Sequence, residues 1–191
     1  MWLAVLGVLA AAPEAVSART EKAGATIITT TFKDVEGEHR VVFTEHALVA
    51  KKDLRSKRLT VVHESRKDAR ARWTAVWDAK DFVNDCAFDV MLALNEKSIS
   101  VTDLDGNGKA EISFAYQLGC RSDVSPLTLK LLMYEGKAKY ALRGQTRSKV
   151  GEEGGKSIEE GGSHEVDPAF GKAPPAFLEH AKAQWDLFVR G

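Results

Sequence analysis

The 191-residue sequence predicts a mainly β protein, antiparallel and sandwich-like (α+β at most), with one C-terminal amphipathic helix. Short runs of β-branched and aromatic residues recur along the chain and alternate with polar residues, as in strands with one buried face. Glycine-containing turns separate these runs, and a helical spacing of apolar residues follows Pro174-Pro175. We therefore expect one β-rich domain over residues 19–191, preceded by a signal peptide at 1–18.

The first half of this domain predicts a hairpin followed by two further strands. Residues 25–33 and 39–44 are rich in β-branched residues and flank a Glu36-Gly37 turn, which is the pattern of a β-hairpin. Residues 51–58 (KKDLRSKR) carry so much charge that we expect a solvated connection. The next strands are expected at 59–64 and 72–77.

Trp73 and Trp77 stand four residues apart in the last of these runs. Successive side chains of a strand point to opposite faces, so both indole rings are expected on one face. Such an aromatic face either packs into the core or stacks on sugar rings.

The second half of the domain predicts more antiparallel strands. Residues 87–94 fit a strand or a helix, and we favour a strand because Asp89 then lies on the polar side of an alternation. The further strands are expected at 98–103 and 110–117, which alternate well, and at 127–135 and 138–144, which form a hairpin about Glu135-Gly136-Lys137.

The C-terminal part predicts a flexible loop and then the helix. Residues 149–166 are rich in glycine and glutamate, a composition that cannot bury a core. Pro175 suits a first helical turn, so an amphipathic helix is expected near 175–189. Its apolar residues recur at helical spacing: Phe177, Leu178, Ala181, Trp185 and Phe188.

The N-terminus reads as an export signal. Residues 2–12 form an unbroken apolar run that is too short to span a bilayer and fits the central region of a secretory signal peptide. Val16-Ser17-Ala18 supplies small residues for cleavage. We therefore expect a periplasmic or secreted protein with no transmembrane span in the mature chain; the alternative is a buried N-terminal helix.

Charge and cysteine content narrow the function classes. The 27 Lys and Arg residues balance 27 Asp and Glu, which argues against nucleic acid as the main partner because phosphate binding needs a basic excess. The two cysteines, Cys86 and Cys120, are a candidate disulfide if the chain is exported. In a chain that stays in the cytosol they would be two free buried thiols.

One segment carries recognisable chemistry, and we call residues 103–111 the acidic loop. Asp103, Asp105, Asn107 and Glu111 place oxygen-bearing side chains at loop positions one, three, five and nine, and the backbone carbonyl of Lys109 adds a candidate at position seven. Calcium takes six to eight oxygen ligands, which alternating residues of a tight loop can supply. The two glycines between them permit the required turns.

The acidic loop is a poor EF-hand because Phe114 stands at position twelve, where that motif needs a bidentate glutamate. It is similar instead to the calcium loops between strands of FG-GAP repeats, in which a carboxylate at position nine closes the site, as Glu111 would here. A metal-free hairpin turn is the alternative. Because Cys86 and Cys120 bracket the loop, a structural calcium is favoured over a catalytic one.

Several motifs follow one another in the last two thirds of the chain: DCAFD (85–89), TDLDGNG (102–108), DVSP (123–126), MYEG (133–136), KYALRG (139–144) and DPAF (167–170). From about Trp77 to Trp185 the chain thereby resembles a family of exported bacterial proteins loosely labelled as surface polysaccharide biosynthesis proteins. The resemblance supports export, the paired cysteines and the acidic loop. It implies no reaction.

The leading hypothesis is an exported, non-catalytic binding or accessory module of the cell envelope, with envelope polysaccharide or an envelope protein as partner. We assign no catalytic residue. One alternative is a polysaccharide-acting enzyme with paired carboxylates drawn from Asp89, Asp123 and Glu135. Another is an inhibitor-type protein that presents residues 149–166 or 123–126 to an enzyme.

Overall fold

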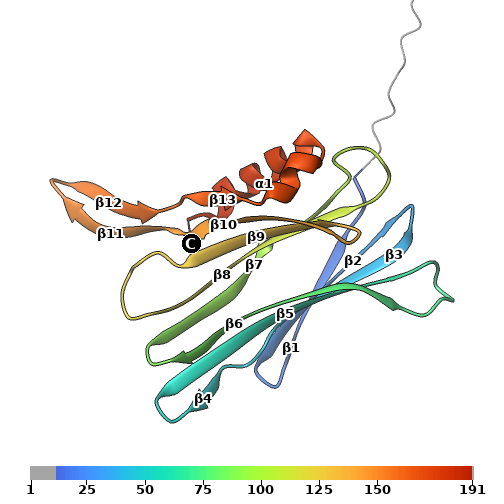
Figure 1. Ribbon diagram of the computed structural model, residues 1–191. Coiled ribbons are helices and arrows are strands. Elements are labelled where there is room, and N and C mark those ends of the chain that lie inside the picture. Colours follow the sequence, from blue (N-terminus) through green and yellow to red (C-terminus); the bar gives the residue numbers. More distant parts are fainter. Residues whose placement is uncertain (1–11, 191) are drawn as a thin grey trace, which may run out of the picture.

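The computed structural model describes residues 12–190 and has two stacked antiparallel sheets with a helix on the outer face of the second sheet (Figure 1). In the first sheet the strands are ordered β1-β2-β3-β5-β4, and β6 pairs with the other edge of β5. Its strands are β1 (Val16–Lys22), β2 (Ala25–Asp34), β3 (Gly37–Glu45), β4 (Val49–Lys51), β5 (Leu54–Arg66) and β6 (Thr74–Cys86).

The second sheet has the order β13-β10-β9-β8-β7, and a separate two-stranded hairpin extends from it. The prediction of a mainly β, antiparallel protein with one C-terminal helix is confirmed. The remaining elements are β7 (Asp89–Thr102), β8 (Glu111–Arg121), β9 (Thr128–Glu135), β10 (Ala138–Gln145), β11 (Arg147–Glu153), β12 (Lys156–Gly161), β13 (His164–Val166), a 3-10 turn (Pro168–Lys172) and α1 (Pro175–Phe188).

The main core lies between the two sheets. Alternating residues of the first sheet point inward, and an edge-to-face contact between Phe43 and Phe114, with ring centroids 5.0 Å apart, joins the two layers. Burying this apolar surface is the principal stabilising contribution to such a sandwich. The fully buried members include Val41, Phe43, Leu59, Leu92, Ile112 and Phe114.

A second core lies between α1 and the outer face of the second sheet. Phe177, Ala181 and Trp185 recur on one side of the helix and are fully buried against the sheet. The Trp185 indole also donates to the Gly162 carbonyl at 3.2 Å. The second sheet is therefore covered on both faces, which explains why residues 111–116 of β8 are all buried.

The charged segment 51–58 is not the solvated connection that its composition predicts. Residues 54–58 begin the 13-residue strand β5, which pairs with β4 across a Lys52-Asp53 turn. Lys57 donates to the Glu45 carboxylate at 2.9 Å and to the Leu92 carbonyl at 2.7 Å, so it connects the two sheets. A strand with a solvated face tolerates charged side chains. Backbone pairing therefore makes residues 54–58 a strand in spite of their charge.

Residues 149–166 form a hairpin of β11 and β12, with a register shift between Lys149 and Gly151, followed by β13, where composition predicts a flexible loop. Both strands of the hairpin lie largely in solvent, in keeping with a composition that cannot bury a core. Gly154 and Gly155 have positive φ angles at its tip, a conformation that glycine adopts without strain.

Trp73 and Trp77 do not share a face. Trp77 points into the core and stacks on Tyr134, with ring centroids 3.8 Å apart. The indole of Trp73 lies against the guanidinium groups of Arg40 and Arg66 at 4.6 and 4.5 Å. Of the two alternatives considered for an aromatic face, core packing applies to Trp77 only.

A β-bulge accounts for the separation of the two indole rings. Trp77 pairs with His63, but the next pair is Ala75 with Glu64, so Val76 is an extra residue on β6. An inserted residue reverses the alternation of side chains on its strand. Simple counting along the sequence therefore assigned Trp73 to the wrong face.

The signal-peptide prediction for residues 1–18 falls mostly on residues 1–11, which lie outside the described part of the chain. Val16, Ser17 and Ala18 belong to β1 and pair with residues 29–31 of β2. Within residues 12–190, no helix combines the length and apolar character needed to cross a bilayer.

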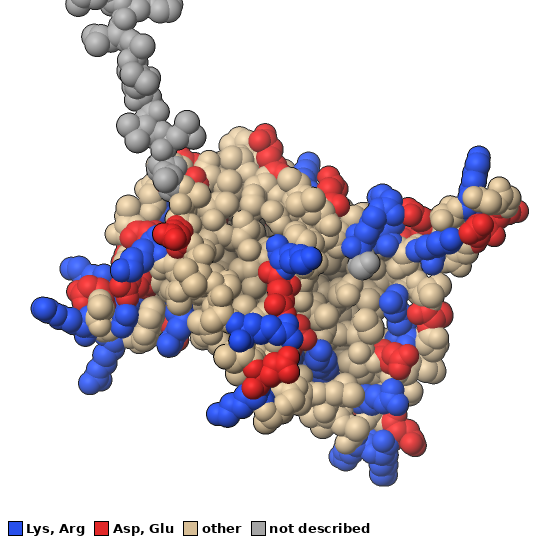
Figure 2. All heavy atoms as spheres, turned by 180° about the vertical axis from the view of Figure 1, so that it is seen from behind, with Lys and Arg blue, Asp and Glu red and all other residues tan. Residues whose placement is uncertain are grey.

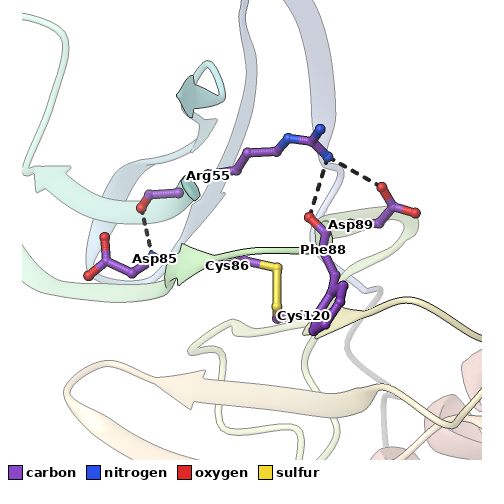
Figure 3. Close-up of a disulfide and its surroundings, with 7 residues drawn as sticks. Arg55, Asp85, Cys86, Phe88, Asp89 and Cys120 are labelled. Atoms are coloured by element: carbon purple, nitrogen blue, oxygen red, sulfur yellow. Dashed lines mark hydrogen bonds and ion pairs between the residues drawn. A yellow bond between two sulfur atoms is a disulfide. The ribbon is translucent and has the colours of Figure 1, made fainter. Parts of the chain in front are cut away.

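The predicted disulfide is present. Cys86 at the end of β6 is bonded to Cys120 near the end of β8, so the bond connects the two sheets (Figure 3). Beside it the Arg55 guanidinium donates to the Phe88 carbonyl at 3.4 Å and pairs with Asp89 at 3.5 Å.

Removing this disulfide should lower the free energy of unfolding by about 3–4 kcal/mol, because the bond restricts the unfolded chain over the segment from Cys86 to Cys120. Urea unfolding of a Cys86→Ala/Cys120→Ala variant measures the loss. A reductant should destabilise the wild type and leave the double variant unchanged. Equal midpoints for the two proteins would contradict the expectation.

Candidate metal centre

The acidic loop joins β7 to β8 and is attached to the β2–β3 hairpin of the first sheet. The Val35 amide donates to the Gly108 carbonyl at 3.0 Å, and the Ala110 amide donates to the Asp34 carboxylate at 3.0 Å. Figure 1 shows this loop and the β2–β3 turn at the same end of the molecule. The loop is therefore a junction between the two sheets.

Hydrogen bonds from backbone amides shape the loop. The Gly108 amide donates to Asp103 at 3.1 Å, the Asn107 amide to Asp105 at 3.1 Å, and the Lys109 amide to the Asn107 side-chain oxygen at 2.7 Å. Gly108 has a φ of +83°, and a Cβ added there would lie 2.6 Å from a Val35 methyl group. Glycine at this position is thus required by both conformation and space.

Glu111 is the central residue of the site. Its side chain is 0% exposed. One carboxylate oxygen, Oε2, accepts from the Thr102 hydroxyl and from the Leu104 amide, both at 2.9 Å. The other oxygen, Oε1, is buried without a hydrogen-bond partner in the described part of the chain, and so is Oδ1 of Asp103.

Three carboxylates converge here: one oxygen each from Asp103, Asp105 and Glu111 lie within 4.8 Å of one another. Oxygens bound to calcium at about 2.4 Å lie no farther apart than this. The donor set contains only oxygen, which suits a hard cation such as calcium. The unpartnered buried oxygens therefore fit an ion of this kind.

The charge environment of Glu111 also favours a bound cation. Burial is the largest influence and raises the pKa of Glu111 to about 7, with further increases from Asp105 and Glu135 and opposing hydrogen bonds from Leu104 and Thr102. A buried carboxylate that lacks a compensating charge costs free energy. A bound divalent cation would supply that charge.

Not all the predicted ligands point into the site. Asn107 uses its side-chain oxygen for the Lys109 amide, and its side-chain nitrogen donates to Asp105 at 3.0 Å and to Glu135 at 2.7 Å. The Lys109 ammonium turns away to Glu36 at 2.6 Å. The ligand roles of Asn107 and of the Lys109 carbonyl therefore stay predictions.

Glu135 is an acidic neighbour of the acidic loop. The sequence indicated it only as a turn residue and as one of three candidate catalytic carboxylates. It lies at the end of β9, directly opposite Glu111 in the β8–β9 register. The predicted hairpin at Glu135-Gly136-Lys137 brings the end of β9 to a sheet edge, but pairing between β8 and β9 was needed to identify which loop lies there.

Glu135 lies far from the other two candidate catalytic carboxylates along the second sheet, and Asp89 and Asp123 are exposed. Asp89 pairs with Arg121 at the end of the second sheet opposite to Glu135. Its side chain is 79% exposed and forms an ion pair with Arg55, while Asp123 accepts from the Ser125 amide in an exposed loop. Glu111 has a raised pKa, but a carboxyl that is 0% exposed cannot reach a substrate.

The comparisons with known proteins supply no relative: no family model, no curated protein and no solved structure matches this chain. The resemblance to exported surface polysaccharide biosynthesis proteins therefore stays a prediction. Functional reasoning depends on the chain's own geometry.

Without divalent cations, stability should fall as pH rises, because of Glu111. Its folded pKa of about 7 exceeds the ordinary 4.5, so the protonated form stabilises the fold. That contribution is fully present below pH 4.5 and is lost as pH rises through 7, by roughly 3 kcal/mol. Urea unfolding in chelator at several pH values measures it.

A Glu111→Gln variant should remove this part of the pH dependence and be the more stable protein in chelator at pH 8. Glu160→Gln, which changes an exposed residue of β12, is the matched control and should behave as the wild type. Parallel pH profiles for Glu111→Gln and the wild type would refute the assignment.

Proposed function

We propose that the protein is an exported, calcium-stabilised β-sandwich module of the cell envelope that binds a partner and catalyses no reaction. The observation that carries the calcium proposal is the buried, unpartnered Oε1 of Glu111, a residue whose carboxylate clusters with those of Asp103 and Asp105. Glu111 would close the coordination shell, with Asp103 and Asp105 as further ligands. The ion would supply charge compensation and rigidity.

A structural role follows from where the site lies. The acidic loop precedes the first residue of β8, whereas Cys120 lies near the end of that strand. The loop connects to β2 and β3, and the disulfide connects to β6. Calcium and the disulfide would thus hold the two sheets together at opposite ends.

Export is supported by the disulfide, since such bonds persist in oxidising compartments and are rare in the cytosol. Extracellular modules also meet calcium at concentrations that weak sites can use. We propose a periplasmic or secreted location on these grounds, together with the apolar N-terminal sequence.

For the partner, we propose envelope polysaccharide or an envelope protein. Figure 2 shows Lys and Arg interspersed with Asp and Glu over the face that it presents, so charge of one sign does not dominate there. Such a surface suits a neutral or mixed-charge partner better than a polyanion. The link to surface polysaccharide comes from the sequence resemblance.

An inhibitor-type role is the second candidate, and one observation favours it. The β11–β12 hairpin is exposed along its length and projects from the body of the molecule (Figure 1). An exposed hairpin of this kind can be presented to another protein. The polysaccharide-acting enzyme finds less support, because Asp89 and Glu135 lie at opposite ends of the second sheet and both Asp89 and Asp123 are exposed.

Calcium should raise the melting temperature of the protein relative to chelator. Saturation at 100 times the dissociation constant stabilises by about 2.7 kcal/mol, which corresponds to roughly 5–10 °C for a domain of this size. Thermal melts followed by circular dichroism measure the shift. Asp105→Ala should abolish it.

The matched control is Asp53→Ala, which changes an exposed turn aspartate between β4 and β5 and should keep the calcium shift. Identical melts of the wild type in calcium and in chelator would sink the calcium proposal.

A further inference from the structure

Three side chains form a hydrogen-bonded series beside the acidic loop, and we call Asp34, His39 and His63 the histidine chain. Asp34 Oδ1 lies 2.8 Å from His39 Nε2, and His39 Nδ1 lies 3.0 Å from His63 Nε2. His39 and His63 are 5% and 4% exposed. These two histidines are distant in sequence and meet only through β3–β5 pairing.

The hydrogen bonds determine where the protons are. An ionised Asp34 can only accept, so His39 carries its proton on Nε2. When His39 is neutral, it accepts at Nδ1 and His63 donates from Nε2. This leaves Nδ1 of His63 as a buried acceptor without a partner in the described part of the chain.

The side chains packed directly around His63 are uncharged or imidazole, and the only charge within residues 12–190 that favours an added proton there is the more distant Asp34. Phe32 of β2 stacks on His39 with ring centroids 4.8 Å apart, and Trp77 of β6 lies 5.1 Å from His63. Behind Trp77 is Tyr134 of β9, a phenol whose pKa burial raises to about 12 and which is therefore neutral. The titratable groups that act on His63 are His39 and, beyond it, Asp34.

The histidine chain is connected to the acidic loop through Asp34. One oxygen of this carboxylate serves His39, and the other accepts from the Ala110 amide at 3.0 Å. The adjacent Val35 amide holds the Gly108 carbonyl. A loop fixed by calcium therefore also fixes Asp34 and, through it, the two buried imidazoles.

We propose that the histidine chain makes calcium binding proton-dependent: calcium keeps the end of the sandwich closed over a neutral His63, and protonation of His63 opens that end and releases the ion. This inference rests on the proposed calcium site and assigns its regulation. The ligand carboxylates are not the groups invoked.

The direction of the pH effect on calcium affinity follows from the linkage between proton binding and calcium binding. Burial is the main reason why the pKa of His63 is lowered from the usual 6.5 to about 4. Positive charge on a protonated His39 lowers it further, and the Asp34 carboxylate opposes the shift. Opening the end to water would return His63 toward 6.5. Protons on His63 therefore favour the calcium-free form between pH 6.5 and 4. This contribution lowers the affinity from pH 7.5 to 5 by up to roughly 30-fold, in addition to the loss from protonation of Glu111.

Calorimetric titration of calcium at pH 7.5, 6.5, 5.5 and 5.0 tests the coupling. His63→Gln keeps a donor for His39 and removes the titration, so its affinity should fall less steeply than that of the wild type. His46→Gln changes a partly exposed histidine at the other end of β3 and should follow the wild type.

Equal slopes for the wild type and His63→Gln would overturn the coupling and leave the calcium site standing. No calcium binding by the wild type at pH 7.5 would overturn the proposed site, and the coupling with it. If His63→Gln does not fold, the ring-proton NMR titration of His63 in the wild type decides the question. Its pKa should be lower in calcium than in chelator, and equal values would refute the proposal.

Discussion

The rest of the structure depends on β8, a strand that is covered on both faces. Its residues 111–116 face the first sheet on one side and α1 on the other. Every polar group on such a strand must find a partner within the protein, since water cannot reach it. At one end the strand begins with the Glu111 carboxylate, and near the other it reaches Cys120. The disulfide thus secures one end of the most buried strand, and hydrogen bonds between the acidic loop and Asp34 and Val35 hold the other.

The strands could be predicted from the sequence wherever one face is apolar and the other polar. Residues 25–33 and 39–44 follow that rule, and their hairpin is as expected. The hairpin of residues 127–144 is also as expected, although its strands are buried on both faces and were indicated by their apolar runs and glycine turn. The prediction was wrong for residues 54–58 because the charged side chains of β5 find cross-sheet partners or solvent. A highly charged composition predicts that residues are exposed to solvent. It does not predict whether they form a strand, because backbone pairing decides that.

The acidic loop could be identified because its ligand-type residues are close in sequence. Asp103, Asp105 and Glu111 repeat at intervals that a tight loop turns inward, and they converge. Asp34 and Glu135 could not be assigned to the same junction, since they arrive from the first sheet and from β9. The histidine chain is hidden for the same reason: His39 and His63 are 24 residues apart and become neighbours only through register.

The two ends of the sandwich differ in how their stability responds to the surroundings. A disulfide in an oxidising compartment is unaffected by modest changes in pH or calcium concentration. At the other end, Glu111 and Asp103 hold unpartnered carboxylate oxygens, and His63 holds an unpartnered imidazole nitrogen. Each of these groups is stable there only while its charge is compensated or absent. This end is therefore where cation and proton concentrations can alter the fold, while the disulfide keeps the two sheets joined.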